Sequence, residues 1–148
     1  MENDRKKQQG FSLIELLIVM VIIGLLASLV GPKMFGKVGK SKQKSAKAQI
    51  SMFETALDMY RLDMGKYPTD DMGLRALRAK PDGAADDTKW DGPYLPKEIP
   101  LDPWGNEYQY HSPSEHGDYE IFSYGADGAE GGEGEDQDIF NWKEIEKD

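Results

Sequence analysis

The sequence predicts an α+β fold in which one long N-terminal helix packs on a small antiparallel sheet. Three observations carry this prediction. An apolar run covers residues 11–31, helical spacing of apolar side chains continues through residues 32–64, and two short segments of alternating side chains follow at 107–111 and 119–124. At 148 residues the chain has room for one globular domain beyond the apolar run, and we place that domain at 65–148.

The apolar run contains a single ionisable side chain, Glu15. A helix needs about 20 apolar residues to cross a hydrocarbon core of roughly 30 Å, so the run is long enough to span a membrane. A carboxylate at mid-bilayer costs about 2.5–3.5 kcal/mol, and we therefore expect Glu15 to have a partner. The free amine that a peptidase would create by cutting after Gly10 is a suitable partner for this carboxylate.

Residues 1–10 form a short polar leader that carries three basic side chains but no apolar core. An ordinary secretory signal has an apolar segment of about 7–15 residues followed by its cleavage site. In this chain the proposed cut between Gly10 and Phe11 precedes the apolar segment, which would therefore stay on the mature protein. The alternative is an uncut signal anchor that carries a stray glutamate.

Beyond the apolar run, the helix is expected to continue as an amphipathic segment. Gly31 and Pro32 predict a break or kink, because proline removes one backbone hydrogen bond and clashes with the preceding turn. Apolar side chains then recur every three or four residues and form one core-facing stripe: Ala46, Ile50, Phe53, Leu57 and Tyr60. Gly65 and Pro68 are expected to end the helix.

The globular domain is expected to begin with a short helix around Leu74, capped by Thr69 or Asp70. A proline-rich stretch around Trp90 follows, and its aromatic side chains predict a loop that is pinned to the core. The two alternating segments are predicted to be strands of an antiparallel hairpin, joined by the connector 112–117.

Residues 125–138 form an acidic, glycine-rich loop. Its carboxylates alternate with glycines: Asp127, Glu130, Glu133, Glu135, Asp136 and Asp138. Such a run is typical of a solvated or disordered segment, but two features favour a metal site. The aromatic segment 139–142 would hold the far end of the loop, and glycines let backbone carbonyls turn inward as the oxygen ligands that Ca²⁺ requires. The spacing is not that of an EF-hand.

Composition argues against several functions. The formal net charge is −9, and phosphate binding needs a basic surface, so no nucleic-acid partner is expected. The chain has no cysteine, which removes both a thiol nucleophile and disulfide bonds. His111 and His116 flank the hairpin turn and have no partner at metal or triad spacing, so we interpret them as exposed turn residues. No enzymatic activity is predicted.

The N-terminal motif resembles the class III signal of type IV pilins and pseudopilins, with a basic leader, Gly10, Phe11 and Glu15. Later motifs narrow the resemblance to the major pseudopilins of type II secretion systems, the general secretion pathway protein G family: Tyr67–Thr69, Gly92–Pro96, Asp102–Gly105 and Ser123–Gly128. This resemblance spans nearly the whole chain and implies a type IV pilin-like fold. The runner-up is a type IV pilin for adhesion, motility or DNA uptake. A third interpretation is a membrane-tethered calcium-binding module that does not polymerise.

The resemblance implies a structural subunit of a periplasmic filament that drives the export of folded proteins across the outer membrane of a Gram-negative bacterium. A prepilin peptidase would cleave between Gly10 and Phe11 and methylate Phe11. Glu15 of one subunit would then pair with the Phe11 amine of a neighbour. The implied partners are further copies of the chain, minor pseudopilins, the prepilin peptidase, the inner-membrane platform with its assembly ATPase, and the secretin.

By the same resemblance, the acidic loop would bind one structural calcium ion. The carboxylates implied as ligands are those of Asp127, Asp136 and Asp138. Backbone carbonyls implied as ligands are those of Tyr124, Ala129 and Gly132.

The resemblance also implies a single inner-membrane span at 11–31, with the C-terminal domain in the periplasm. One simple rule disagrees with this topology. The lysines after the span outnumber the basic residues of the leader, so the positive-inside rule would place the C-terminal side in the cytoplasm. We give the class III leader more weight than this count. The lysines between residues 33 and 47 are interpreted as a solvated helix face that can pair with acidic surfaces of neighbouring subunits or with lipid phosphates.

Overall fold

The computed structural model describes residues 10–82 and 89–145, and the side chains of residues 31–35 are not described. The predicted leader therefore lies almost wholly outside the described residues. The chain divides into two compact units, 1–37 and 38–148, which we describe separately.

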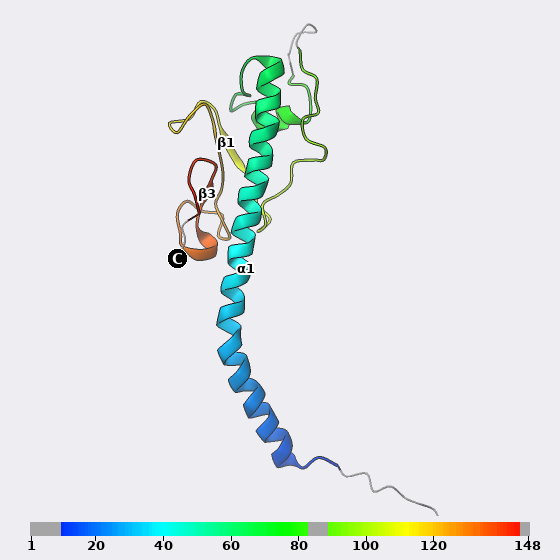
Figure 1. Cartoon of the computed structure of the whole chain (residues 1–148), viewed down its shortest axis with the longest axis vertical. Helices are drawn as coiled ribbons and strands as arrows, with labels where there is room; N and C mark the ends of the chain where they lie inside the picture. The colour runs from blue at the N-terminus through cyan, green and yellow to red at the C-terminus, as the bar shows by residue number, and fades with distance from the viewer. Residues whose placement is uncertain (1–9, 83–88, 146–148) are drawn as a thin grey trace, which may run out of the picture. The chain divides into compact units, whose positions relative to one another are not determined.

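The first element, helix α1, extends over Leu13–Met64 (Figure 1). The helix continues through Gly31 and Pro32, so of the break or kink predicted there, the break is not present. Proline removes only one hydrogen bond from the helix, and the long helical segments on both sides keep the backbone helical. The predicted end of the helix is confirmed, because α1 stops at Met64 and the Gly65 amide donates to the Arg61 carbonyl at 2.8 Å.

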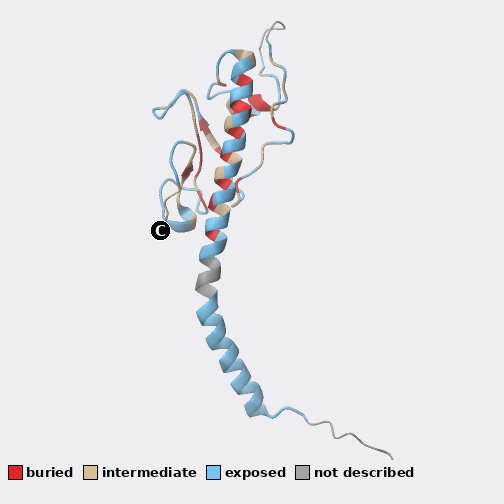
Figure 2. Cartoon of the chain, in the orientation of Figure 1, coloured by how far each residue is buried: buried red, intermediate tan, exposed pale blue. Residues whose placement is uncertain are grey.

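In the first unit, the segment Leu13–Val30 has a mean hydropathy of 2.9 and is long and apolar enough to cross a membrane, by length and composition. Side chains that are normally found in a protein core are exposed along this whole segment (Figure 2). Leu13, Leu17 and Leu29 are each more than 60% exposed. An apolar helix without cover within its own unit needs lipid or other protein chains around it.

In the second unit, the predicted stripe on α1 forms one side of the hydrophobic core. Its five side chains are all buried: Ala46, Ile50, Phe53, Leu57 and Tyr60. Opposite the stripe lie Leu77, Leu95, Ile121 and Ile139, which are also buried. The long-range packing of one helical face against later elements explains why this half of α1 is helical and stable.

A short 3₁₀ helix, η1, covers Gly73–Leu77 and buries Leu74 and Leu77. The predicted side-chain cap is wrong, because no described side chain bonds to the start of η1 and the Met72 amide donates to the Thr69 carbonyl instead. The Asp70 carboxylate is already used elsewhere, since it accepts a hydrogen bond from the Ser112 amide at 2.6 Å. The following loop is pinned as predicted, through a bond of 3.0 Å from Trp90 Nε1 to the Ala76 carbonyl.

The sheet has three antiparallel strands in the order β1-β2-β3: Gln109–His111, Glu120–Ser123 and Ile139–Phe140. Tyr110 pairs with Ile121 in the first ladder, and Ser123 pairs with Ile139 in the second. The predicted hairpin is confirmed, although both strands are shorter than expected. The third strand was not predicted, because two residues are too few to show an alternating pattern. The fold is thus α+β, with a long helix on a small antiparallel sheet.

Candidate functional site

The N-terminal motif lies at the start of α1. Gly10 and Phe11 precede the helix and are exposed, with the Phe11 side chain 83% exposed. Ser12 and Glu15 exchange two hydrogen bonds, since the Ser12 amide donates to Glu15 Oε2 at 2.7 Å and the Glu15 amide donates to Ser12 Oγ at 3.2 Å. This reciprocal pair is a capping box that starts the helix. The Glu15 carboxylate therefore lies one turn from the Gly10–Phe11 bond.

The acidic loop, residues 125–138, folds back on itself. The Ala126 amide donates to the Glu135 carbonyl at 2.9 Å, and a second 3₁₀ helix, η2, covers Gly134–Asp136. Gly125 has a positive φ of 70°, and a Cβ placed there would lie 2.8 Å from the backbone of Glu135 and Asp136. The two sides of the loop therefore touch through a glycine that no other residue can replace without strain. The loop is folded, while most of its carboxylates are exposed.

Asp138 differs from the other acidic residues of the loop. Its Oδ2 accepts a hydrogen bond of 2.9 Å from the Gly131 amide, whereas its Oδ1 is buried and has no hydrogen-bond partner among the described residues. Burial raises the pKa of Asp138, the Gly131 bond opposes that effect, and the nearby charges of Glu130 and Asp127 raise the pKa further. A cation at this position would give the buried oxygen a partner and would reduce the repulsion between the carboxylates.

The structure brings only some of the predicted ligands together. Asp127 and Asp138 interact electrostatically, and the Asp127 carboxylate also accepts a bond of 3.1 Å from the Ala129 amide. Asp136 is exposed, although its backbone lies against Gly132. Within 10–82 and 89–145, no three His, Asp or Glu side chains are arranged to hold a metal. Carboxylates alone therefore do not form a site, and a calcium ion would depend on carbonyl ligands such as those of Tyr124, Ala129 and Gly132.

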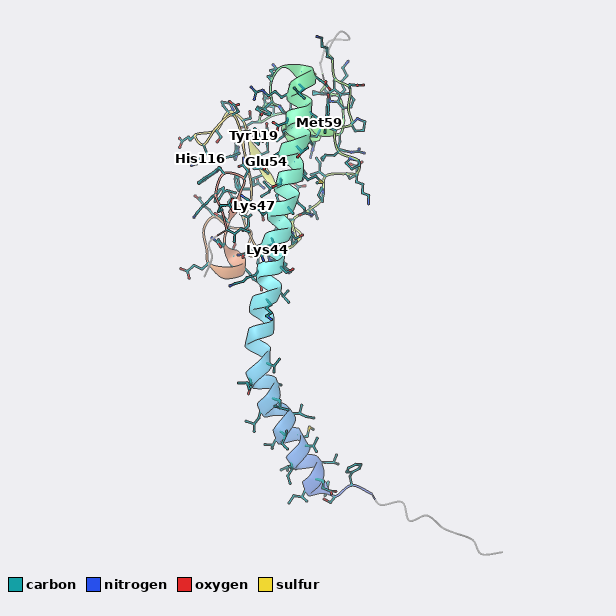
Figure 3. All side chains as sticks on the ribbon, in the orientation of Figure 1. Lys44, Lys47, Glu54, Met59, His116 and Tyr119 are labelled. Carbon is teal, nitrogen blue, oxygen red and sulfur yellow. The ribbon has the colours of Figure 1, made fainter. Side chains whose placement is uncertain are left out.

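Two polar residues of α1 hold the far side of the loop, and sequence analysis did not identify their role. Gln43 donates to the Gly134 carbonyl and, at 3.4 Å, to Gln137 Oε1. Lys47, which is labelled in Figure 3, donates to the carbonyls of Phe140, Asn141 and Lys143 at 2.7, 3.0 and 2.7 Å. A sequence gives little sign of such contacts, because the partners are more than 90 residues apart.

A buried network holds the near side of the loop. Asp102 is 5% exposed, and its Oδ1 accepts from the amides of Trp104 and Asn106 at 3.0 and 2.8 Å. Its Oδ2 accepts from Ser123 Oγ at 2.6 Å, and that hydroxyl accepts from the Gly125 amide. Asn106 also donates to the Gly125 carbonyl at 3.1 Å. Both backbone groups of Gly125 are thus fixed where the loop begins.

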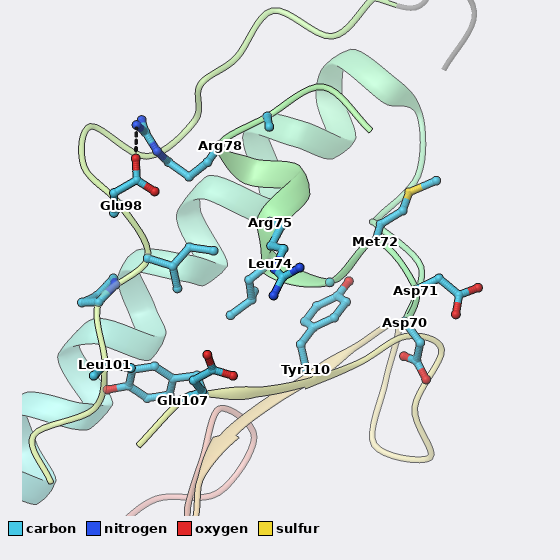
Figure 4. A pocket seen from close by; sticks show the side chains of 15 residues that line it. Asp70, Asp71, Met72, Leu74, Arg75, Arg78, Glu98, Leu101, Glu107 and Tyr110 are labelled. Carbon is cyan, nitrogen blue, oxygen red and sulfur yellow. Dashed lines mark hydrogen bonds and ion pairs between the residues drawn. The ribbon is translucent and has the colours of Figure 1, made fainter. Parts of the chain in front are cut away.

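A separate cleft of about 630 Å³ lies between η1 and β1 (Figure 4). Its two arginines are Arg75 and Arg78, and Arg78 already donates to the Leu95 carbonyl and to Glu98, at 2.6 and 3.0 Å. The described residues that line the cleft include no serine, threonine, cysteine or histidine. A nucleophile–base pair is therefore missing from this described lining.

The two histidines are exposed, as predicted, but each faces one carboxylate. His111 Nδ1 lies 3.6 Å from Asp70, and His116 Nδ1 lies 3.1 Å from Glu120. The His116 ring also stacks on Trp142 with a centroid distance of 3.8 Å. The contacts with Asp70 and Trp142 tie the hairpin to its neighbours, and among the described residues neither histidine is part of a metal or triad geometry.

Comparison with known proteins decides between the filament families. Residues 33–142 match the family model for type II secretion system (T2SS), protein G, and residues 5–31 match the prokaryotic N-terminal methylation motif. The chain belongs to the type II secretion system protein G family. The range matched by the methylation motif includes Gly10, Phe11 and Glu15.

Curated relatives match the sequence of this chain along almost its full length. The chain is 49% identical over 137 residues to type II secretion system core protein G of Vibrio cholerae serotype O1, covering 93% of each protein. It is 45% identical over 138 residues to the Pseudomonas aeruginosa core protein G, covering 93% of this chain and 97% of the relative. The crystal structure of the major pseudopilin from enterohaemorrhagic Escherichia coli is 38% identical, with a TM-score of 0.61. That match covers 75% of this chain and 95% of the crystallised one.

The protein G family is a structural one, and the chain is a major pseudopilin of a type II secretion system. The prediction that the chain is not an enzyme is confirmed by this membership. The type IV pilin alternative is set aside on the same ground.

Proposed function

We propose that this pseudopilin is the repeating subunit of a helical filament and that its N-terminal helix forms the filament core. The observation that carries the proposal is the exposed apolar helix Leu13–Val30, which has one carboxylate beside the proposed cleavage point. A prepilin peptidase would cleave between Gly10 and Phe11 and methylate Phe11, which leaves a charged amine at the start of the helix. Glu15 of one subunit would then pair with the Phe11 amine of its neighbour.

The pairing follows from the free energy of charge burial. When apolar helices pack together, an unpaired carboxylate among them is heavily penalised, whereas a paired amine and carboxylate partly offset their desolvation. The pair therefore favours the single axial offset at which both charges meet. One contact repeated by rotation and rise produces an open fibre when it does not close into a ring.

Before assembly, the proposed location of the subunit is the inner membrane, with the span at 11–31 and residues 65–148 in the periplasm. Minor pseudopilins, an inner-membrane platform and an assembly ATPase would start and drive the filament. Growth would push folded proteins through an outer-membrane secretin. Membership of the protein G family supports these partners as a set.

We also propose that the loop 125–138 binds one structural calcium ion. The support is chemical: Asp138 has a buried oxygen that finds no partner among the residues that the structure describes, and its pKa is raised by burial and by neighbouring carboxylates. Asp127, Asp136 and Asp138, with the carbonyls of Tyr124, Ala129 and Gly132, would hold the ion. Calcium would neutralise the clustered charge and stabilise a domain that has no disulfide.

The filament proposal is tested by Glu15→Gln, which removes the charge and keeps the shape. The full chain is expressed with a prepilin peptidase and the secretion machinery. Mass spectrometry reports cleavage and methylation, and electron microscopy reports filaments. We expect the variant to be processed but not assembled, whereas the control Glu115→Gln, at an exposed hairpin site, should be processed and assembled. Normal filaments from Glu15→Gln would refute the pairing, and an uncut wild-type chain would refute the leader assignment.

The calcium proposal is tested on the full chain in detergent by calorimetric titration and thermal unfolding, with EGTA as the metal-free condition. We expect one site, and a stabilisation of about 2.7 kcal/mol at a hundredfold excess of calcium over Kd. Asp138→Asn should weaken binding, whereas Glu115→Gln should leave it unchanged. An unchanged melting temperature in EGTA, with no heat of binding, would refute the calcium site.

A further inference from the structure

One ridge of α1 carries the contacts with the acidic loop. Gly39, Gln43 and Lys47 follow each other at intervals of four residues, so they lie along the same side of the helix. We call these three residues the docking ridge. All three belong to the second unit, together with the loop that they contact.

Gly39 allows the loop to approach the helix backbone. It is buried, and a Cβ built there would lie 2.5 Å from Cγ of Glu135. The Glu135 side chain therefore occupies the space that any larger residue at position 39 would need. This contact brings the 3₁₀ helix η2 against α1.

Gln43 holds the middle of the ridge. Its side chain is only 6% exposed, and its Nε2 donates to the Gly134 carbonyl and to Gln137 Oε1. Both acceptors lie in the second half of the acidic loop, between the predicted ligands Gly132 and Asp138. A shift of Gln43 would therefore move the segment that has to present those ligands.

Lys47 holds the chain immediately after the loop. An ammonium group has three donors, and Lys47 uses them on three backbone carbonyls, those of Phe140, Asn141 and Lys143. Phe140 is two residues from Asp138 and belongs to β3. Lys47 thus fixes the end of the loop through uncharged acceptors and neutralises no carboxylate in these bonds.

We propose that the docking ridge couples calcium binding to α1, with Gln43 and Lys47 as positioning residues that contact no metal. This inference rests on the proposed calcium site and adds to it. Since the ridge contacts the loop and the chain just after it, it lowers the ordering cost of bringing the ligands together. By thermodynamic reciprocity, bound calcium stabilises helix segment 38–47 by the same coupling free energy.

Substitution of Lys47 by methionine separates positioning from simple electrostatics. Removing a positive charge near an acidic site should strengthen calcium binding if charge alone matters. Loss of the three carbonyl bonds should weaken binding if Lys47 positions the loop. The two causes thus predict opposite signs. Lys44→Met is the matched control, because it removes the same charge from an exposed lysine one turn earlier.

The experiment uses the full chain in detergent, with calorimetric titration of Ca²⁺ at constant ionic strength. We expect about tenfold weaker binding for Lys47→Met, the size found when supporting residues of metal sites are removed. Binding by Lys44→Met should stay within about twofold of wild type or become tighter. Equal or tighter binding by Lys47→Met would overturn the coupling while the calcium site stands. Absence of binding by the wild type would overturn both.

Hydrogen exchange on the wild type provides a test that does not depend on a folded variant. Calcium should increase the protection of amides in segment 38–47 more than that of amides in segment 53–60, which packs on the core. Equal changes in both segments would indicate global stabilisation only and would overturn the coupling. In Lys47→Met, the extra protection of 38–47 should be lost.

Discussion

The buried carboxylate of Asp102 provides the sharpest test of how the domain supports its loop. Asp102→Ala would leave three donors without a partner: the Trp104 amide, the Asn106 amide and the Ser123 hydroxyl. A buried donor that loses its acceptor costs about 1–3 kcal/mol; the Ser123 hydroxyl is buried, whereas the two amides belong to half-buried residues and are assigned the lower end of this range. Even the lower value for each donor gives a loss of about 3 kcal/mol, a large part of the stability of a domain of this size.

The measurement is thermal unfolding of the full chain, followed by circular dichroism in detergent. Asp102→Asn should cost only about 1 kcal/mol, because its carbonyl oxygen still accepts from the two amides and its amide group can donate to Ser123. Glu107→Ala, at an exposed neighbouring position, should stay within about 0.5 kcal/mol of wild type. A loss of less than about 1 kcal/mol for Asp102→Ala, or equal losses for the alanine and asparagine variants, would refute the reasoning.

Three further predictions concern the core, the loop and the tyrosines. Leu57→Ala should lower the free energy of unfolding by about 2–5 kcal/mol, because Leu57 is fully buried, whereas Leu62→Ala at an 84% exposed position should have little effect; thermal unfolding compares them. Gly125→Ala should lower the free energy of unfolding by about 1–3 kcal/mol from its positive φ alone, and by more because of the backbone contact at 2.8 Å. Thermal unfolding should show a larger loss for Gly125→Ala than for Gly131→Ala, where φ is also positive but the surrounding space is open. Burial raises the pKa of Tyr110 from 10.0 to about 12, so its contribution to stability is complete below pH 10 and is lost as the pH rises towards 12. An ultraviolet absorbance titration that finds Tyr110 ionising near pH 10 in the folded chain would contradict this last prediction.

Elements that depend on local pattern could be predicted from the sequence. The stripe from Ala46 to Tyr60 repeats with the helical period, and the structure buries every member of it. The apolar run and Glu15 were recognisable because an ionisable group in a membrane-grade segment is costly. Such signals need only neighbouring residues, which a sequence shows directly.

The elements that were missed depend on distant contacts. Strand β3 has two residues, and only its pairing with β2 defines it as a strand. Thr69 or Asp70 was predicted to cap η1, but the Asp70 carboxylate instead accepts a hydrogen bond from the Ser112 amide, which follows β1. In both cases tertiary partners, which the local sequence does not show, outweigh local preference.

The same limit applies to the lysines that follow the apolar run. They were interpreted together as one solvated face, available to lipid phosphates or to neighbouring subunits. In the structure these lysines differ in their environment: Lys47 uses its three donors inside its own domain, whereas Lys44 is exposed. A lysine whose donors are satisfied by carbonyls of its own chain would lose those bonds on binding phosphate. Intermolecular pairing by this face therefore has to come from positions other than Lys47, whose three hydrogen bonds hold the chain immediately after the acidic loop against α1.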